Sequence, residues 1–153
     1  MKPYACWLFP AFALIVSCTS HDDCCTIVDI GMEITYVSTD GNFLEGIDEA
    51  DITVYHRKDQ EWVAYFQGNL DHPKGIAIEE NSEGEPYLWL SPNTEYFSEN
   101  HTETKLEFPG GEEDIIRAQF DRSEGNLVCT KVWYNDNLRW EANATGRAFE
   151  VLK

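Results

Sequence analysis

Apolar and polar residues alternate with a period of two along most of the chain after residue 27. Val28, Ile30, Met32, Ile34 and Tyr36 fall on one face of a first extended segment. Successive side chains of a β-strand point to opposite faces, so this spacing predicts a strand with one buried face. The 3.6-residue apolar spacing of an amphipathic helix is missing from every long stretch. The pattern therefore predicts an all-β chain.

The alternation recurs along the rest of the chain. In the second segment Ile52, Val54 and His56 share one face, and the polar turn 58–61 leads into an apolar run at 62–67. A short polar turn between two such segments predicts a β-hairpin. Further strands are predicted over 76–80, 87–90, 102–108, 115–120, 127–134, 138–141 and 147–152, with Asn135-Asp136-Asn137 as a tight hairpin loop.

Short strands at this spacing, with no helices to connect parallel neighbours, favour an antiparallel sheet protein. We expect a single immunoglobulin-like or transthyretin-like antiparallel β-sandwich of about 8–9 strands, with a small β-barrel as the alternative. Residues 27–153 are long enough for one domain with one core.

The N-terminus carries a different pattern. Lys2 precedes an apolar run from Tyr4 to Val16. The run is shorter than the roughly 20 residues of a membrane-spanning helix and is typical of an export signal. Ile15-Val16-Ser17-Cys18 resembles the lipobox of bacterial lipoproteins. That resemblance implies a signal peptide over 1–17, lipid on Cys18 that holds the protein to a membrane, and a tether over 18–26. An ordinary signal peptide with an incidental Cys18 is the alternative.

Three further stretches carry a resemblance. Cys24-Cys25, the segment 69–75 and the segment 128–135 resemble a group of short, uncharacterised lipoproteins of gut Bacteroidetes. Thr19 to Asp23 resembles the acidic export signal of such lipoproteins. The resemblance implies a small all-β domain that is lipid-anchored in the outer membrane and exposed at the cell surface. It implies no catalytic residue.

The composition narrows the function classes. The chain has 28 Asp and Glu against 11 Lys and Arg, a net charge of −17, so nucleic acid and anionic lipid headgroups repel it. Aromatic residues make up 13% of the chain, which excludes a disordered polar chain. The acids are spread along the sequence, as on a solvated and aggregation-resistant surface.

Three cysteines remain outside the signal and the lipobox. An exported compartment permits disulfides, so we expect Cys129 to pair with Cys24 or Cys25 and to tie the first strand to the 127–134 strand. A strained bridge between Cys24 and Cys25, a metal site and a catalytic thiol are the alternatives.

The sequence contains no familiar catalytic motif. There is no Gly-x-Ser-x-Gly, no His-Glu-x-x-His and no glycine-rich phosphate loop. His21, His56, His72 and His101 are scattered, and we interpret them as solvated polar residues. The sequence therefore favours a protein that is not an enzyme and needs no cofactor.

Two features remain as candidate binding residues. The acidic loop 40–51 offers Asp40, Asp48 and Asp51 as possible calcium ligands, although the regular spacing of a calcium loop is missing, so we expect no metal. Among Trp62, Trp89, Trp133 and Trp140, most should fill the core. Trp140 follows a hairpin, and we expect it to be the exposed one that contacts a ligand.

Two classes of function follow from these observations. The first is a non-catalytic binding or accessory module for a glycan, a peptide or an envelope protein. The second is a structural envelope lipoprotein without a small ligand. A small hydrolase is the third and least favoured class.

Overall fold

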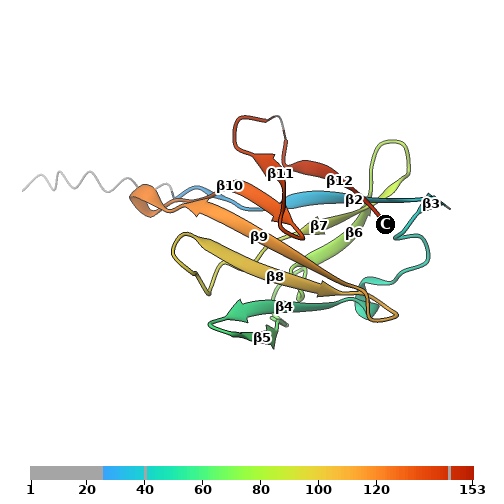
Figure 1. Ribbon diagram of the computed structural model, residues 1–153, viewed down its shortest axis with the longest axis horizontal. Helices are drawn as coiled ribbons and strands as arrows, with labels where there is room; N and C mark the ends of the chain where they lie inside the picture. The colour runs from blue at the N-terminus through green and yellow to red at the C-terminus, as the bar shows by residue number, and fades with distance from the viewer. Residues whose placement is uncertain (1–25, 40, 145) are drawn as a thin grey trace, which may run out of the picture.

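The protein is all-β in the computed structural model, which describes residues 26–39, 41–144 and 146–153 (Figure 1). The signal peptide, the lipobox Cys18, the tether cysteines Cys24 and Cys25, and Asp40 lie outside the described residues. No helix in the described ranges is long and apolar enough to cross a membrane.

Twelve strands form two sheets within these ranges. The first sheet has the order β1 (Val28–Asp29), β10 (Leu127–Tyr134), β9 (Glu113–Asp121), β8 (His101–Glu107), β4 (Thr53–Lys58) and β5 (Glu61–Ala64), with β11 (Asn137–Glu141) also paired to β10. The second sheet has the order β12 (Ala148–Leu152), β2 (Met32–Ser38), β7 (Pro86–Leu90) and β6 (Ile76–Glu80), with β3 (Gly41–Asn42) also paired to β2.

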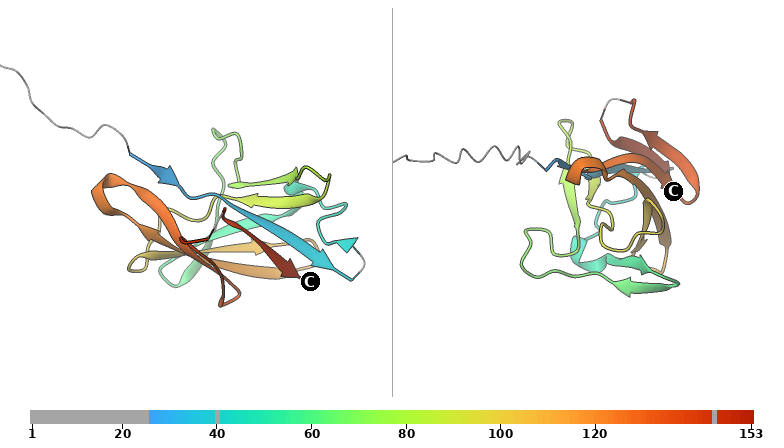
Figure 2. Two further views of the ribbon diagram at one scale, coloured as in Figure 1. Left: turned by 90° about the horizontal axis from the view of Figure 1, so that it is seen from above. Right: turned by 90° about the vertical axis from the view of Figure 1, so that its left-hand side faces the viewer.

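The two sheets curl toward each other around a common interior (Figure 2). The chain passes from the first sheet to the second at Ile30-Gly31, between β1 and β2. Most neighbouring strands are antiparallel, and the predicted all-β fold of two mostly antiparallel sheets is confirmed. Two pairings are parallel: β1 runs beside β10, and β12 runs beside β2. The twelve strands of the described residues exceed the 8–9 that the sequence predicted, and two of them, β1 and β3, are only two residues long.

The predicted alternation decides which side chains form the core. Met32, Ile34 and Tyr36 of β2 are buried, while the residues between them are partly or fully exposed. Ile52 and Val54 are buried in the same way at the start of β4. Val28, which the pattern placed on the same face as Met32, is 61% exposed because β1 belongs to the other sheet.

Two hairpins depend on residues that tolerate positive φ. Asp59 has φ 54° at the tip of the β4–β5 hairpin. Asn135 and Asp136 have φ 45° and 64° between β10 and β11, as a two-residue hairpin turn requires. Both hairpins are where the sequence predicted them. The β4–β5 hairpin also contributes Arg57, Lys58 and Asp59 to the lining of a surface groove.

Candidate functional site

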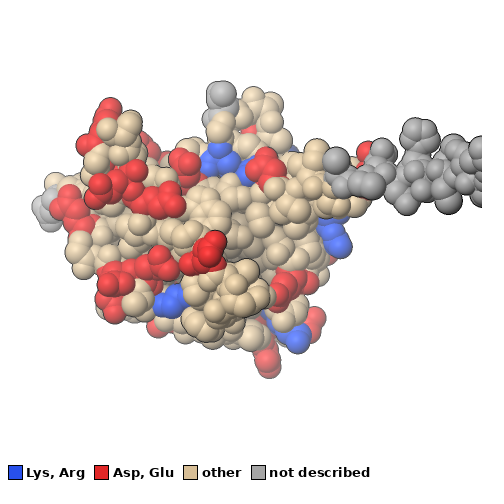
Figure 3. Space-filling view, turned by 180° about the vertical axis from the view of Figure 1, so that it is seen from behind, with Lys and Arg blue, Asp and Glu red and all other residues tan. Residues whose placement is uncertain are grey.

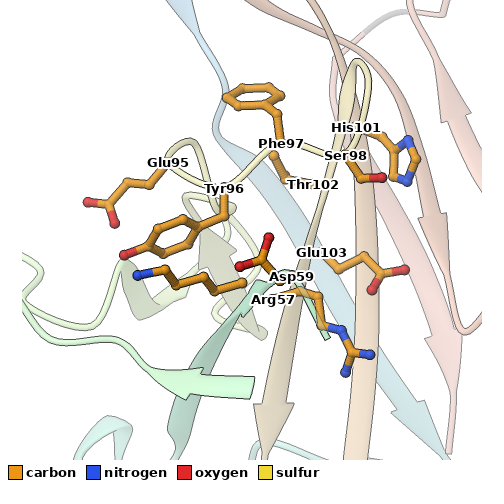
Figure 4. Close-up of a pocket in the computed structure, with 10 residues that line it drawn as sticks. Arg57, Asp59, Glu95, Tyr96, Phe97, Ser98, His101, Thr102 and Glu103 are labelled. Atoms are coloured by element: carbon orange, nitrogen blue, oxygen red, sulfur yellow. The ribbon is translucent and has the colours of Figure 1, made fainter. Parts of the chain in front are cut away.

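A groove of about 530 Å³ lies at one end of the first sheet, where the β4–β5 hairpin and the start of β8 meet the segment 95–98 (Figure 4). Pockets of about 300 to 1,000 Å³ are typical of small-molecule sites. The residues that line the groove are Arg57, Lys58, Asp59, Glu95, Tyr96, Phe97, Ser98, His101, Thr102 and Glu103.

The β4–β5 hairpin supplies the cations of the groove. Arg57 follows the buried His56 in β4, so its side chain points out of the sheet. Its guanidinium carbon lies 4.9 Å from the ring centre of Trp62 on the neighbouring strand. The ammonium of Lys58 lies 5.1 Å from the ring centre of Tyr96, which joins the hairpin to the segment 95–98. Both distances are those of cation–π contacts.

Asn93 holds the segment 95–98 in place. Its side chain is fully buried, and its Oδ1 accepts hydrogen bonds from the backbone N–H groups of Glu95 at 2.9 Å and Tyr96 at 3.1 Å. Its Nδ2 lies 3.3 to 3.5 Å from the carbonyl oxygens of Arg57, Tyr96 and Glu103. The Asn93 side-chain amide therefore connects the three segments that form the groove, namely β4, the segment 95–98 and β8.

Two threonines of β8 complete this support. The backbone N–H of Asn93 donates to Oγ1 of Thr104 at 2.7 Å, and Oγ1 of Thr102 donates to the carbonyl of Asn93 at 2.6 Å. Both threonines and Asn93 are buried. Hydrogen bonds in a buried site fix geometry strongly, because leaving any of these groups unpaired would be unfavourable.

A smaller pocket of about 180 Å³ adjoins the groove and shares Glu95 and Tyr96 with it. Its other lining residues are His56, Val63, Ala64, Tyr65, Phe66 and Gln67. His56 is buried, and neither of its ring nitrogens has a hydrogen-bond partner among the described residues. The Tyr65 ring is stacked on the imidazole, with 3.9 Å between the ring centres. Burial lowers the pKa of His56 to about 4, so the imidazole is neutral at pH 7.

The groove combines charges of both signs, hydroxyl groups and an aromatic ring. Arg57 and Lys58 face a lining that also contains Asp59, Glu95 and Glu103. By contrast, acidic side chains predominate over Lys and Arg on the face shown in Figure 3. This mixture of groups suits the binding of a polar ligand through hydrogen bonds.

Cys129 is buried and has no disulfide partner among the described residues, and its Sγ lies 3.6 Å from the carbonyl oxygen of Lys131. Burial raises the pKa of this thiol to about 11, which is the opposite of what a catalytic thiol needs. The predicted bridge to Cys24 or Cys25 has no support in the described part of the chain.

Trp140, expected to be the exposed tryptophan, is buried in the core at 9% exposure, so that prediction is wrong. Its Nε1 donates to the carbonyl of Gly146, and the guanidinium carbon of Arg147 lies 4.7 Å from its ring centre. The chain after β11 folds back over the indole and covers it. Trp62, Trp89 and Trp133 are instead the partly exposed tryptophans.

Of the calcium candidates, Asp48 and Asp51 lie within the described residues and Asp40 does not. Asp48 accepts a hydrogen bond from the N–H of Ala50 at 2.8 Å and so begins the short helix Glu49–Asp51. Asp51 is exposed. Across the described residues no three His, Cys, Asp or Glu side chains gather as a metal site would require.

The four histidines were interpreted as solvated, and for His56 that interpretation is wrong. His101 lines the groove, and His72 lies beside Trp89, with 5.4 Å between the ring centres. The alternation of β4 already placed His56 on the buried face, so the signal was present. The role of Asn93 had no comparable signal, because the sequence shows it only as a turn residue after β7.

Comparison with known proteins identified no relative of this chain. No protein-family model, no curated protein and no solved structure matches the chain.

Proposed function

We propose that the protein is a lipid-anchored envelope protein whose folded domain is a non-catalytic binding module, and that the groove binds a glycan. One observation carries this proposal. A groove of about 530 Å³ lined by hydrogen-bonding and charged side chains is held rigidly by the buried Asn93. Rigid support of this kind reduces the entropy that a site loses when it binds a ligand.

The chemistry of the lining favours a glycan. A sugar presents hydroxyl groups around its edge and C–H groups on its faces. The carboxylates of Asp59, Glu95 and Glu103 can accept hydrogen bonds from sugar hydroxyl groups. The guanidinium of Arg57 can donate to the hydroxyl oxygens, and Tyr96 offers an aromatic ring for the sugar face. A few polar groups placed around an aromatic surface are what fixes the orientation of a small ligand.

Several observations support a module without catalysis. Four of the groups with displaced pKa values are buried, namely the His56 imidazole, the Cys129 thiol and the Tyr36 and Tyr134 hydroxyls. His56 lies under Tyr65, and Cys129 and the two tyrosines lie in the core. The groove itself consists of groups suited to hydrogen bonding.

The location is part of the same proposal. Ile15-Val16-Ser17-Cys18 supports lipid on Cys18, and the tether that follows supports display of the domain at the outer membrane surface. Mass spectrometry of the mature N-terminus should find an acylated Cys18. A mature chain that begins at another residue or lacks the acyl groups would contradict the anchor.

A glycan array tests the binding activity. The wild-type protein should bind at least one glycan, and Tyr96→Ala should weaken that binding about tenfold or more, as expected for an aromatic anchor. The matched control is Tyr87→Ala, because Tyr87 lies on the second sheet and its hydroxyl contacts Glu79 at 2.6 Å, away from the groove. Equal binding by wild type and Tyr96→Ala would contradict the groove as the site.

A further inference from the structure

We propose that the smaller pocket beside the groove binds an uncharged sugar ring, with Phe66 against the face of the ring and His56 hydrogen-bonded to one of its hydroxyl groups. This inference rests on the proposed function, because it assumes that the domain binds a glycan. It adds which part of the glycan the pocket recognises.

Apolar and aromatic side chains line one wall of the pocket. Val63 is 41% exposed and Phe66 is 67% exposed, and both line this pocket. Tyr65 and Tyr96 add two aromatic rings to the same wall. These exposed rings and methyl groups offer apolar contact area to a ligand that enters the pocket. The C–H face of a sugar ring is a suitable partner for such a wall.

The floor of the pocket holds an unpaired hydrogen-bonding group. His56 is 3% exposed, and neither ring nitrogen has a partner among the described residues. A buried polar group without a partner destabilises a folded protein, and such groups are rare. A neutral imidazole has one donor and one acceptor, and a sugar hydroxyl also has both. A hydroxyl group would satisfy His56, whereas the carboxylate of Glu95 in the pocket lining would repel an anion.

The rim of the pocket supplies further partners for hydroxyl groups. Nε2 of Gln67 donates to Oε1 of Glu95 at 3.1 Å, so an amide and a carboxylate lie at the pocket edge. Glu95 and Tyr96 also line the larger groove. A glycan of several units can therefore extend from the pocket across Tyr96 into the groove.

Tyr65 controls access to the imidazole. Its ring lies over His56 with an angle of 20° between the planes, and the imidazole nitrogens are buried beneath it. We expect the Tyr65 ring to move aside when the sugar binds.

Nuclear magnetic resonance of the histidine side chains tests the inference. The full mature protein, labelled at histidine, is titrated with glucose, galactose, mannose and N-acetylglucosamine. At least one sugar should shift the ring signals of His56 in a saturable way, while those of His72, in the loop between β5 and β6, stay unchanged. Glucuronic acid, which carries a charge, should shift His56 less than the best neutral sugar.

Two variants separate binding from folding. Phe66→Ala removes an exposed side chain and should leave the melting temperature unchanged while weakening sugar binding about tenfold or more. His56→Leu should fold and also lose the sugar. The control is Leu70→Ala, because Leu70 is an exposed apolar residue that does not line the pocket.

Each outcome decides one proposal or both. If a glycan binds but neither His56 nor Phe66 responds, the inference is wrong and the proposed function stands. If no glycan binds at the pocket or at the groove, both are wrong. Equal binding by wild type, Phe66→Ala and His56→Leu would also overturn the inference.

Discussion

Arg147 and Asp29 form a two-pronged ion pair, with Nη1 3.0 Å from Oδ1 and Nη2 3.1 Å from Oδ2. The same guanidinium donates to the carbonyl of Gly31 at 2.6 Å and to that of Cys129 at 3.4 Å. These contacts join the β1–β2 crossing and β10 to Arg147, the residue that directly precedes β12. The point where the chain changes sheets is thus fixed by one largely buried arginine.

The Arg147→Ala variant should therefore be destabilised by about 1–3 kcal/mol, because buried carbonyls lose a charged donor. Chemical denaturation of the variant and the wild type measures this difference in the free energy of unfolding.

The Arg147 guanidinium holds the pKa of Asp29 below its usual value, so the stability from the pair is present above about pH 4 and is lost at lower pH, as Asp29 becomes protonated. Arg139→Ala, at an exposed site, is the control and should change little. Equal stability of the two variants would refute this role.

The Asn93→Ala variant should lose both stability and ligand binding. Its amide is paired with backbone groups on three segments, and each buried group left without a partner costs about 1–3 kcal/mol. Asn81→Ala is a matched control, since Asn81 accepts from the N–H groups of Glu83 and Glu85 in an exposed turn. That control should keep its affinity for the ligand. Full glycan binding by Asn93→Ala would show that the groove does not depend on this support.

His56 should make the protein less stable in mild acid. Burial lowers its pKa to about 4 in the folded state, whereas the unfolded chain has the usual value near 6.5. Between these values the unfolded state binds more protons, so stability is full above about pH 6.5 and falls as the pH drops toward 4. The loss is on the order of 3 kcal/mol.

The His56→Leu variant tests this directly, because leucine cannot be protonated. Its stability should be higher than that of the wild type at pH 5 and should lack this part of the pH dependence. Denaturation curves at several pH values measure both. The same slope in the variant and the wild type would assign the acid sensitivity to other groups.

Cys129 should resist alkylation in the folded protein. Its thiol is buried, and the pKa of about 11 leaves almost no thiolate at pH 8. Iodoacetamide labelling followed by mass spectrometry should modify Cys129 only after denaturant is added. The stability from the thiol is present below its unfolded pKa near 9 and is lost as the pH rises toward 11. Rapid labelling of the native protein at Cys129 would contradict the burial.

The strands could be predicted well because their signal is local. The predicted segments 76–80 and 127–134 agree with β6 and β10 at both ends. The alternation also predicts burial of Ile52 and Val54 before any contact is known, and it places His56 on the same face, although we interpreted that histidine as solvated. A period of two is a property of the strand itself, so neighbours are not needed to detect it.

The groove could not be predicted, because it depends on contacts between distant segments. Asn93 acquires its role only when it meets carbonyls of Arg57 and Glu103. Trp140 was expected to be exposed, and the fold buries it through a contact with Gly146 and Arg147 that local spacing does not reveal. The parallel pairing of β12 with β2 is likewise a long-range choice.

Amide hydrogen exchange of the mature protein, measured with and without the glycan that binds best on an array, tests the central claim most directly. Binding in the groove predicts slower exchange at residues 57–59, 95–98 and 101–103, with unchanged exchange in β2 and β7 of the second sheet. The Tyr96→Ala variant should lose this protection. Protection confined to the second sheet, or no protection with any glycan, would contradict the account.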